Sequence, residues 1–434
     1  MIPNSELFKL SVDISAGLHF FKGKRQNICA SSGSQFAVIE PGTGAIVAQC
    51  PNADDALVDI VVNQAEKVQP SWAAMSPLER SKVLLRAATL IRANLETIAS
   101  WETRTNGKPI VEARVDIESS ADTFAFYGGI LPAEFKGDFY DLPTDGQGNR
   151  FAYTRLSVWS AVLELGIILS RPVVGSPFAP GSPVLLGELL KAAGLPDGVF
   201  NVVQGEAETG QLICLHEKIA RVSFTGSVST GRKIQQTCAL RGIKPVTLEL
   251  GGKSAFIVFE DANLQDAVAS AILANFCNQG EVCTNATRVF VQQSVLNSFQ
   301  TKLLTELGSK MRVGNPLEDS TNVGATINEQ HLEKGFYFEP AVLTNLDDDM
   351  EIVKEEIFGA VMLILPFQTE EEAVSRANAT QFGLASGLCT TSLARAHRVA
   401  AQLKVGTVFV NTYNDAEVKA VYMHIGEGLQ HNLG

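Results

Sequence analysis

The sequence predicts an α/β protein of two or three domains, and three observations support this prediction. The chain has 434 residues, more than one hydrophobic core usually contains. From residue 185 onward the patterns alternate: residues 186–193 are typical of a helix, and residues 199–203 and 219–224 of buried strands. A glycine turn and a helix through residue 237 follow the second strand. This alternation is typical of a parallel sheet covered by helices.

The composition is that of an ordinary globular protein, with 45% hydrophobic and 19% charged residues. A net charge of −12 argues against nucleic acid or an anionic membrane surface as a partner. The longest apolar run, residues 158–170, is interrupted by Glu164 and is shorter than the roughly 20 residues of a membrane span. The first residues do not have the layout of a signal peptide.

Cysteine and histidine usage predicts a reducing, cytoplasmic setting without a disulfide framework or a metal site. Seven cysteines are an odd number without closely spaced pairs, and the six histidines show no metal-ligand spacing. The cysteines stand at positions 29, 50, 214, 238, 277, 283 and 389.

The first third of the chain predicts a strand from Phe36, a turn, a second strand at 45–48, and packing helices. A helix is expected from about residue 53. A stronger helix begins at Ser76, which can cap its first turn, with Glu79 at the capping-box position.

The helix that begins at Ser76 is expected to end at Gly107 and Pro109, and a further helix is expected at 111–126. In the helix that begins at Ser76, apolar residues at near-helical intervals are expected to form the packing face. These are Leu78, Leu85, Ile91, Leu95 and Ile98.

A glycine turn joins the strand at 219–224 to the following helix. It contains Thr225, Gly226, Ser227 and, one turn later, Gly231. Free N–H groups and the helix dipole at such a terminus favour a phosphate. The spacing differs from the G-x-G-x-x-G of ordinary dinucleotide folds. From the residues alone, both a cofactor loop and a plain tight turn remain open.

A carboxylate and a thiol each stand at the end of a regular element. Glu249 ends the apolar run that begins at Val246 and precedes two glycines, and Cys283 follows a glycine turn about thirty residues later. This pair suits covalent catalysis, with a thiolate nucleophile and a carboxylate base. Taken singly, the cysteine could be a small buried apolar residue and the glutamate a solvated charge at a strand end.

The strings Glu-Leu-Gly-Gly-Lys at 249–253 and Asn-Gln-Gly-Glu-Val-Cys at 278–283 resemble the two signature segments of the NAD(P)-dependent aldehyde dehydrogenases. The resemblance implies an aldehyde dehydrogenase-like α/β fold with a Rossmann-type cofactor domain, an α/β catalytic domain and an oligomerisation hairpin. The implied domains are residues 1–135 with 157–248 for the cofactor, 136–156 for the hairpin around Asp145-Gly146, a shortened catalytic domain at 249–414, and an atypical tail at 415–434.

The same resemblance implies NAD as cofactor and names the residues that bind it. These residues are Thr225, Gly226, Ser227, Gly231, Leu250, Glu356 and Phe358. Glu356 would accept hydrogen bonds from the nicotinamide ribose, and Phe358 would pack beside the ribose and the ring. The family's proline after Gly359 is Ala360 here.

By this resemblance, Cys283 attacks an aldehyde, hydride passes to the nicotinamide, and Glu249 activates the water that hydrolyses the resulting thioester. Within the family, residues 222–227, 242–249 and 287–291 look closest to the dehydrogenases of betaine aldehyde and 4-trimethylaminobutyraldehyde, the latter an enzyme of carnitine biosynthesis. The expected substrate is therefore a small aldehyde, with quaternary-ammonium aldehydes as the candidates that the resemblance suggests. The expected assembly is a homo-oligomer, which is a homotetramer in the family.

Three stretches depart from the family pattern. Between Arg155 and Ser176 the chain is short: it lacks the Asn that binds the oxyanion, and Val174 stands in place of the Lys that binds the adenosine ribose. A second gap follows residues 327–334, and after Asn414 the final oligomerisation strand is replaced. These departures keep two alternatives open: a catalytically impaired relative that binds nucleotide or acts as a scaffold, and a cofactor-independent thiol esterase.

Overall fold

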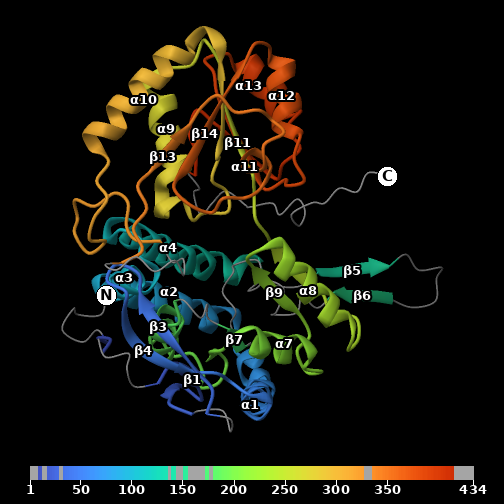
Figure 1. The fold of residues 1–434 in the computed structure, drawn as a ribbon. Coiled ribbons are helices and arrows are strands. Elements are labelled where there is room, and N and C mark those ends of the chain that lie inside the picture. Colours follow the sequence, from blue (N-terminus) through green and yellow to red (C-terminus); the bar gives the residue numbers. More distant parts are fainter. Residues whose placement is uncertain are drawn as a thin grey trace. The chain divides into compact units, whose positions relative to one another are not determined.

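The structure, a computed structural model, contains two compact units, which are described separately (Figure 1). The described residues are 8–11, 17–28, 33–134, 138–142, 150–154, 172–174, 179–326 and 335–414. The first unit comprises Met1–Ile39, Ile46–Thr105 and Ala113–Ala220. The second comprises Glu40–Ala45, Asn106–Glu112 and Arg221–Gly434.

The first unit contains a mixed sheet with strand order β2-β1-β8-β7. Strand β1 (His19–Phe21) pairs antiparallel with β2 (Lys24–Gln26) and β8 (Asn201–Val203), and β7 (Pro172–Val174) runs parallel to β8. Two further strands, β3 (Gln35–Glu40) and β4 (Ala45–Pro51), pair with each other. This confirms the predicted strand, turn and strand.

Helices of the first unit pack around one apolar core that includes Phe20, Trp72 and Val202. The helices are α1 (Asp55–Ala74), α2 (Pro77–Ala93), α3 (Leu95–Asn106), α4 (Ile110–Glu134), α6 (Gly181–Ala192) and α7 (Ala207–Leu215). The first residues of α4 and the last of α3 belong to the second unit. The predicted capping box at the start of α2 is confirmed, because Glu79 N–H donates to Ser76 Oγ and Ser76 N–H donates to the Glu79 carboxylate.

The prediction of one continuous helix from Ser76 to Gly107 is wrong, because the helix is interrupted at Asn94, between α2 and α3. The buried Asn94 side chain accepts from Leu10 N–H at 3.0 Å and donates to the Phe8 and Leu90 carbonyls at 3.0 and 2.8 Å. These bonds hold the chain between α2 and α3 to the N-terminal segment. Leu78 and Leu85 are 57% and 42% exposed, whereas the predicted Ile91 is buried. The other buried apolar residues of α2 are Val83, Leu84, Ala87, Ala88 and Leu90.

Strands β5 (Asp138–Leu142) and β6 (Arg150–Thr154) pair antiparallel in the register Asp138 with Thr154. The predicted hairpin is therefore present, although its turn at Asp145-Gly146 lies outside the described residues. Its pairing with a neighbouring subunit stays a prediction.

The second unit contains a six-stranded, fully parallel sheet of order β13-β14-β12-β11-β15-β16. Its strands are β11 (Ala255–Val258), β12 (Arg288–Gln292), β13 (Ala341–Leu343), β14 (Val361–Phe367), β15 (Ala385–Cys389) and β16 (Thr407–Val410). Its helices are α9 (Leu264–Phe276), α10 (Leu296–Lys310), α11 (Glu351–Lys354), α12 (Glu370–Asn378) and α13 (Leu393–Ala400).

Alternate residues of this sheet enter two different cores, so helices cover both faces (Figure 1). Phe256 and Val258 of β11 pack with α9 and α10 residues such as Phe299. Ala255 and Ile257 of the same strand pack with α12 and α13 residues such as Val399. The predicted α/β fold with parallel sheets is confirmed.

A separate pair of parallel strands, β9 (Val222–Thr225) and β10 (Val246–Glu249), belongs to the second unit together with helix α8 (Val228–Ala239). The two units therefore divide between Ala220 and Arg221. The predicted boundary at 248/249 between a cofactor and a catalytic domain stays a prediction.

Among the described residues, no helix combines the length and apolarity that crossing a membrane would need. The described part of the chain also holds no group of three or more histidine, cysteine or acidic side chains arranged to bind a metal ion. The six cysteines described here are free thiols.

Asn94→Ala should lower the free energy of unfolding by about 1–3 kcal/mol, because it leaves the buried N–H of Leu10 without its acceptor. Chemical denaturation followed by circular dichroism measures this as a lower midpoint. The control is Asn297→Ala, at an exposed position on α10. Equal midpoints for the two variants would contradict the role of Asn94.

Candidate active site

The predicted glycine turn connects β9 to α8 and ends in a solvent-exposed helix N-terminus. Ser227 caps the helix, because its Oγ accepts from Thr230 N–H at 3.3 Å. Thr225, Gly226 and Ser227 are all exposed. The remaining N–H groups of the first turn and the helix dipole therefore face solvent, where an anionic group can reach them.

Gly226 and Gly231 each fill a position where a side chain would collide with a neighbour. A Cβ on Gly226 would lie 2.5 Å from the Phe224 ring, and one on Gly231 would lie 2.6 Å from Leu250 Cδ2. Gly231 thus lets α8 pack closely on the residue that follows β10. Leu250 is buried. Gly226 and Gly231 allow the close packing of the loop in this structure. The predicted contacts of Gly226, Gly231 and Leu250 with a cofactor stay predictions.

Glu249 ends β10 directly beside the glycine turn. The register of the parallel pair aligns Glu249 with Thr225, and Gly226 N–H donates to the Glu249 carbonyl at 3.0 Å. The carboxyl ends of both strands therefore meet at one edge, as expected for binding sites on parallel sheets. This places the predicted base next to the predicted anion site.

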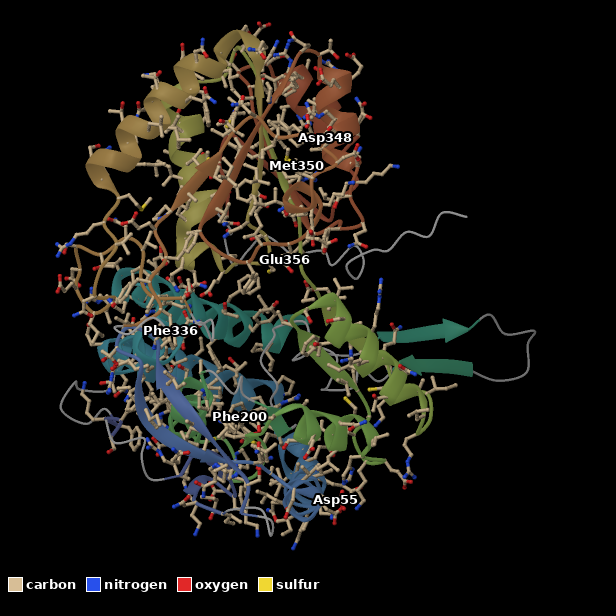
Figure 2. All side chains as sticks on the ribbon, in the orientation of Figure 1. Asp55, Phe200, Phe336, Asp348, Met350 and Glu356 are labelled. Carbon is tan, nitrogen blue, oxygen red and sulfur yellow. The ribbon has the colours of Figure 1, made fainter. Side chains whose placement is uncertain are left out.

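The two glycines after Glu249 bring the thiol segment and Glu356 to the same place. A Cβ on Gly252 would lie 2.5 Å from the Cys283 carbonyl oxygen, and one on Gly251 would lie 2.1 Å from Glu356 Oε2. Gly252 N–H also donates to Glu356 Oε1 at 3.2 Å. Glu356 is labelled in Figure 2, where its side chain lies in the second unit.

The segment that leads to Cys283 has an unusual backbone. Asn278, Gln279 and Gly280 all have positive φ values, of 50°, 54° and 79°. A Cβ on Gly280 would lie 2.2 Å from the Gly359 carbonyl, so this turn packs against the backbone that follows Phe358. Left-handed conformations cost non-glycine residues about 1–3 kcal/mol each, and they persist only where surrounding contacts enforce them.

Cys283 is half-buried, and burial raises the pKa of its thiol above the usual value. The negative charges of Glu249 and Glu356 raise this pKa further, whereas the backbone N–H groups of Cys283 and Thr284 oppose the shift. Both carboxylates are therefore close enough to influence the pKa of the thiol. The structure brings together the predicted nucleophile, base and ribose-binding carboxylate.

A model of the aldehyde dehydrogenase family matches residues 28–163, 173–334 and 329–428 of the sequence, which is most of the chain. The chain belongs to the aldehyde dehydrogenase family. The matched ranges omit residues 164–172, inside the first predicted departure, and overlap at 329–334, directly before the second predicted gap. They also extend past Asn414 to residue 428.

Relatives named 4-trimethylaminobutyraldehyde dehydrogenase align with almost the whole chain. The protein from Oryzias latipes is 41% identical, and the alignment covers 95% of this chain and 90% of that one. The Rattus norvegicus protein is also 41% identical, with 94% and 90% covered. The Homo sapiens protein is 40% identical with the same shares covered.

Solved aldehyde dehydrogenases have the same fold. The NAD-dependent enzyme from Sinorhizobium meliloti superposes with a TM-score of 0.84 at 31% identity, over 96% of this chain and 89% of that one. An indole-3-acetaldehyde dehydrogenase in complex with NAD⁺ gives 0.84 at 30% identity, over 94% and 90%. The predicted aldehyde dehydrogenase-like fold is confirmed.

Within this family member, Phe358 also has a positive φ, of 51°, and its side chain is 48% exposed. An aromatic ring held at the surface by a strained backbone is available for packing against a ligand. Burial raises the pKa of the neighbouring Glu356, whereas the Gly252 N–H and Lys253 oppose this shift. The cofactor roles of both residues stay predictions.

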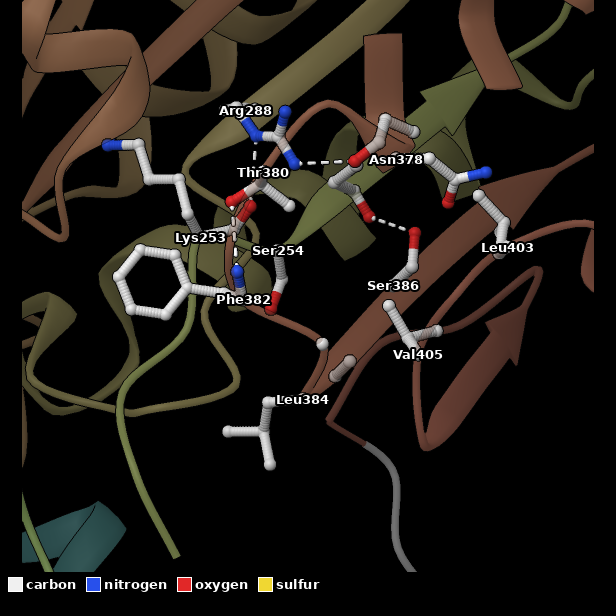
Figure 3. Close-up of a pocket in the computed structure, with 14 residues that line it drawn as sticks. Lys253, Ser254, Arg288, Asn378, Thr380, Phe382, Leu384, Ser386, Leu403 and Val405 are labelled. Carbon is white, nitrogen blue, oxygen red and sulfur yellow. Dashed lines mark hydrogen bonds between the residues drawn. The ribbon is translucent and has the colours of Figure 1, made fainter. Parts of the chain in front are cut away.

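Lys253 is a site residue that the sequence did not single out. It is 1% exposed, and among the described residues its Nζ has no hydrogen-bond partner. Burial lowers its pKa to about 8, helped by the charge of Arg288 and opposed by that of Glu356. Figure 3 shows Lys253 near Arg288, which donates to the Lys253 carbonyl at 2.9 Å. The motif gave no signal for this burial, because an isolated lysine after two glycines is typical of a solvated turn.

The three predicted departures lie largely outside the described residues, which omit 155–171, 175–178, 327–334 and 415–434. The missing oxyanion Asn, the second gap and the C-terminal tail therefore stay predictions. Val174 lies in β7, where only its backbone is described. The homotetramer and the cytoplasmic setting also stay predictions.

Glu249→Gln should lower the apparent pKa of Cys283, because it removes a negative charge that disfavours the thiolate. The folded pKa lies above the usual thiol value, so the variant should react faster with iodoacetamide below that pKa and equally fast well above it. Alkylation rates measured across pH, with the Cys283 peptide quantified by mass spectrometry, test this. Glu260→Gln, at an exposed carboxylate after β11, is the control. Identical titration curves for all three proteins would contradict the charge effect.

Proposed function

We propose that this protein oxidises a small aldehyde to its carboxylic acid with NAD, through a thioester on Cys283. The observation that carries the proposal is the convergence of Cys283, Glu249 and Glu356 beside an exposed helix N-terminus within one compact unit. A thiol next to a carboxylate supports covalent catalysis, and the helix terminus supports binding of a phosphate group.

The described residues fit a nicotinamide dinucleotide. The exposed first turn of α8 offers N–H donors for its pyrophosphate, and the exposed Phe358 ring offers an apolar surface. Glu356 accepts a hydrogen bond from Gly252 N–H through Oε1, which leaves Oε2 as an acceptor for ribose hydroxyls. When bound there, NAD would supply the acceptor for hydride.

The first half of the proposed reaction begins with ionisation of the thiol. Glu249 accepts the Cys283 proton, and Sγ forms a bond to the aldehyde carbon, so the carbonyl oxygen takes up the electron pair. The backbone N–H groups of Cys283 and Thr284 stabilise charge on sulfur. The carbonyl re-forms as hydride leaves carbon with its electron pair, and a thioester remains on Cys283.

Glu249 first releases the thiol proton to solvent. In the second half it takes a proton from a water molecule, whose oxygen attacks the thioester carbon, and it can return that proton to sulfur. The carbon–sulfur bond breaks, and sulfur recovers a proton as the acid leaves. Glu249 ends a strand that pairs with β9, and its charge acts on the Cys283 thiol, so the same carboxylate is available for both steps.

A quaternary-ammonium aldehyde is the proposed substrate class. Relatives about 40% identical carry the name 4-trimethylaminobutyraldehyde dehydrogenase. The charges themselves support this choice, since two carboxylates near Cys283 create a negative potential that favours a cation.

Purified protein incubated with 4-trimethylaminobutyraldehyde and NAD should produce NADH, and Cys283→Ser should abolish production. Replacing the nearby thiol in Cys277→Ala should leave most of the activity. Parallel assays with NADP and with an activated ester distinguish the alternatives. Ester hydrolysis without NADH would support a thiol esterase, and nucleotide binding without either reaction would support an impaired relative.

The cationic substrate should be preferred over its uncharged isostere. We expect kcat/KM for 4-trimethylaminobutyraldehyde to exceed that for 5,5-dimethylhexanal about tenfold, since a favourable cation contact contributes on the order of 1–2 kcal/mol. The two aldehydes have the same shape, so size is controlled. Equal kcat/KM values would leave the aldehyde dehydrogenase reaction in place and reject the quaternary-ammonium substrate.

A further inference from the structure

The turn before Cys283 needs an external support. Asn278 and Gln279 are left-handed residues with side chains, and the thiol follows them within five residues. Internal bonds contribute part of the support: Asn278 Nδ2 donates to the Glu281 carbonyl at 2.9 Å, and Glu281 N–H donates to the Asn278 carbonyl at 2.8 Å. These bonds close the turn on itself but do not fix it to the rest of the unit.

Two hydrogen bonds from elsewhere in the second unit hold the turn in place, in addition to the contact of Gly280 with the Gly359 backbone. Asn278 N–H donates to Glu112 Oε2 at 2.7 Å, although the two residues are 166 positions apart in the sequence. Gln279 Nε2 donates to the Ala325 carbonyl at 3.2 Å. The Glu112 contact is the shorter of the two, and its acceptor is an ionisable carboxylate, which makes the stronger kind of hydrogen bond.

The backbone that carries Glu112 is itself fixed. Ile110 N–H donates to the Pro316 carbonyl at 2.8 Å, and Glu112 N–H donates to the Pro109 carbonyl at 3.0 Å. Gly107, with φ +90°, packs so closely on Ala325 that a Cβ there would lie 2.0 Å from the Ala325 carbonyl oxygen. Glu112 and Ala325 therefore form one rigid support for the turn.

We infer that Glu112 is a positioning residue for Cys283: its carboxylate holds the left-handed turn so that the thiol faces Glu249 and the backbone donors. This inference rests on the proposed role of Cys283 as nucleophile. Glu112 is not among the groups that shift the Cys283 pKa by charge. Its effect is therefore expected through geometry, because a displaced turn takes the Cys283 and Thr284 N–H groups away from sulfur.

Glu112→Ala and the isosteric Glu112→Gln test the inference. We expect the Ala variant to lower kcat about tenfold while KM for NAD stays within a factor of about two, since one charge-assisted hydrogen bond is lost. The Gln variant keeps an acceptor oxygen and should recover part of kcat. The control is Glu118→Gln, which removes a partly exposed carboxylate, paired with Arg92, from the same helix.

Alkylation of Cys283 by iodoacetamide gives a second measurement that does not need turnover. In Glu112→Ala the apparent thiol pKa should rise, because the backbone donors that favour the thiolate move out of place. If the wild-type protein forms no NADH, the proposed function fails while this measurement still tests the support by Glu112. The inference would be overturned if Glu112→Ala kept the kcat and the Cys283 pKa of the wild-type protein. It would also be overturned if kcat of Glu112→Gln were no higher than that of Glu112→Ala while both variants had the melting temperature of the wild-type protein.

Discussion

The close approach of the Gly251–Gly252 backbone to Cys283 and Glu356 is the contact on which the site depends. A side chain at either glycine would collide with a group of the site, at 2.5 Å from the Cys283 carbonyl or 2.1 Å from the Glu356 carboxylate. The contact between Gly280 and the Gly359 backbone is of the same kind. The contacts with the Cys283 and Gly359 backbones cannot be relieved by rotation of a side chain, so they hold these segments of the site close together.

The same proximity has an electrostatic consequence. Burial raises the pKa of the Cys283 thiol, and the charges of Glu249 and Glu356 raise it further, so both favour the protonated form. On the proposed function, the arrival of a cationic ring or substrate would offset that negative potential and favour the thiolate.

The sequence predicts the parts of the site that depend on local patterns. Glu249 at a strand end, the two glycines after it and Cys283 after a glycine turn were all identified from their strings. Glu356 was identified only through the family resemblance, because alone it is typical of a charged turn. Local patterns predict where strands and helices form, but not where a helix is interrupted. The interruption at Asn94 depends on hydrogen bonds to Phe8 and Leu10, which are distant in the sequence.

Other features of the site could not be predicted, because they exist only in the folded chain. The left-handed φ values of Gln279 and Phe358 are set by the contacts around them, and neither residue type favours that conformation. Lys253 is buried beside residues distant in the sequence, such as Arg288, which donates to its carbonyl. Glu112 meets Asn278 from 166 positions away, so no window of sequence contains both residues.

On the proposed function, the alignment of β9 with β10 would connect cofactor binding to chemistry in this unit. Glu249 lies opposite Thr225, and the Glu249 carbonyl accepts the N–H of Gly226. A dinucleotide held by its phosphates at the start of α8 would therefore be anchored to the same backbone that carries the general base. Any shift of one strand along the other would move the base relative to the bound cofactor, and at the same time break the Gly226 hydrogen bond. Because the hydride acceptor and the base must act on one carbon atom in turn, a shared backbone anchor is the simplest way to keep both in register with Cys283.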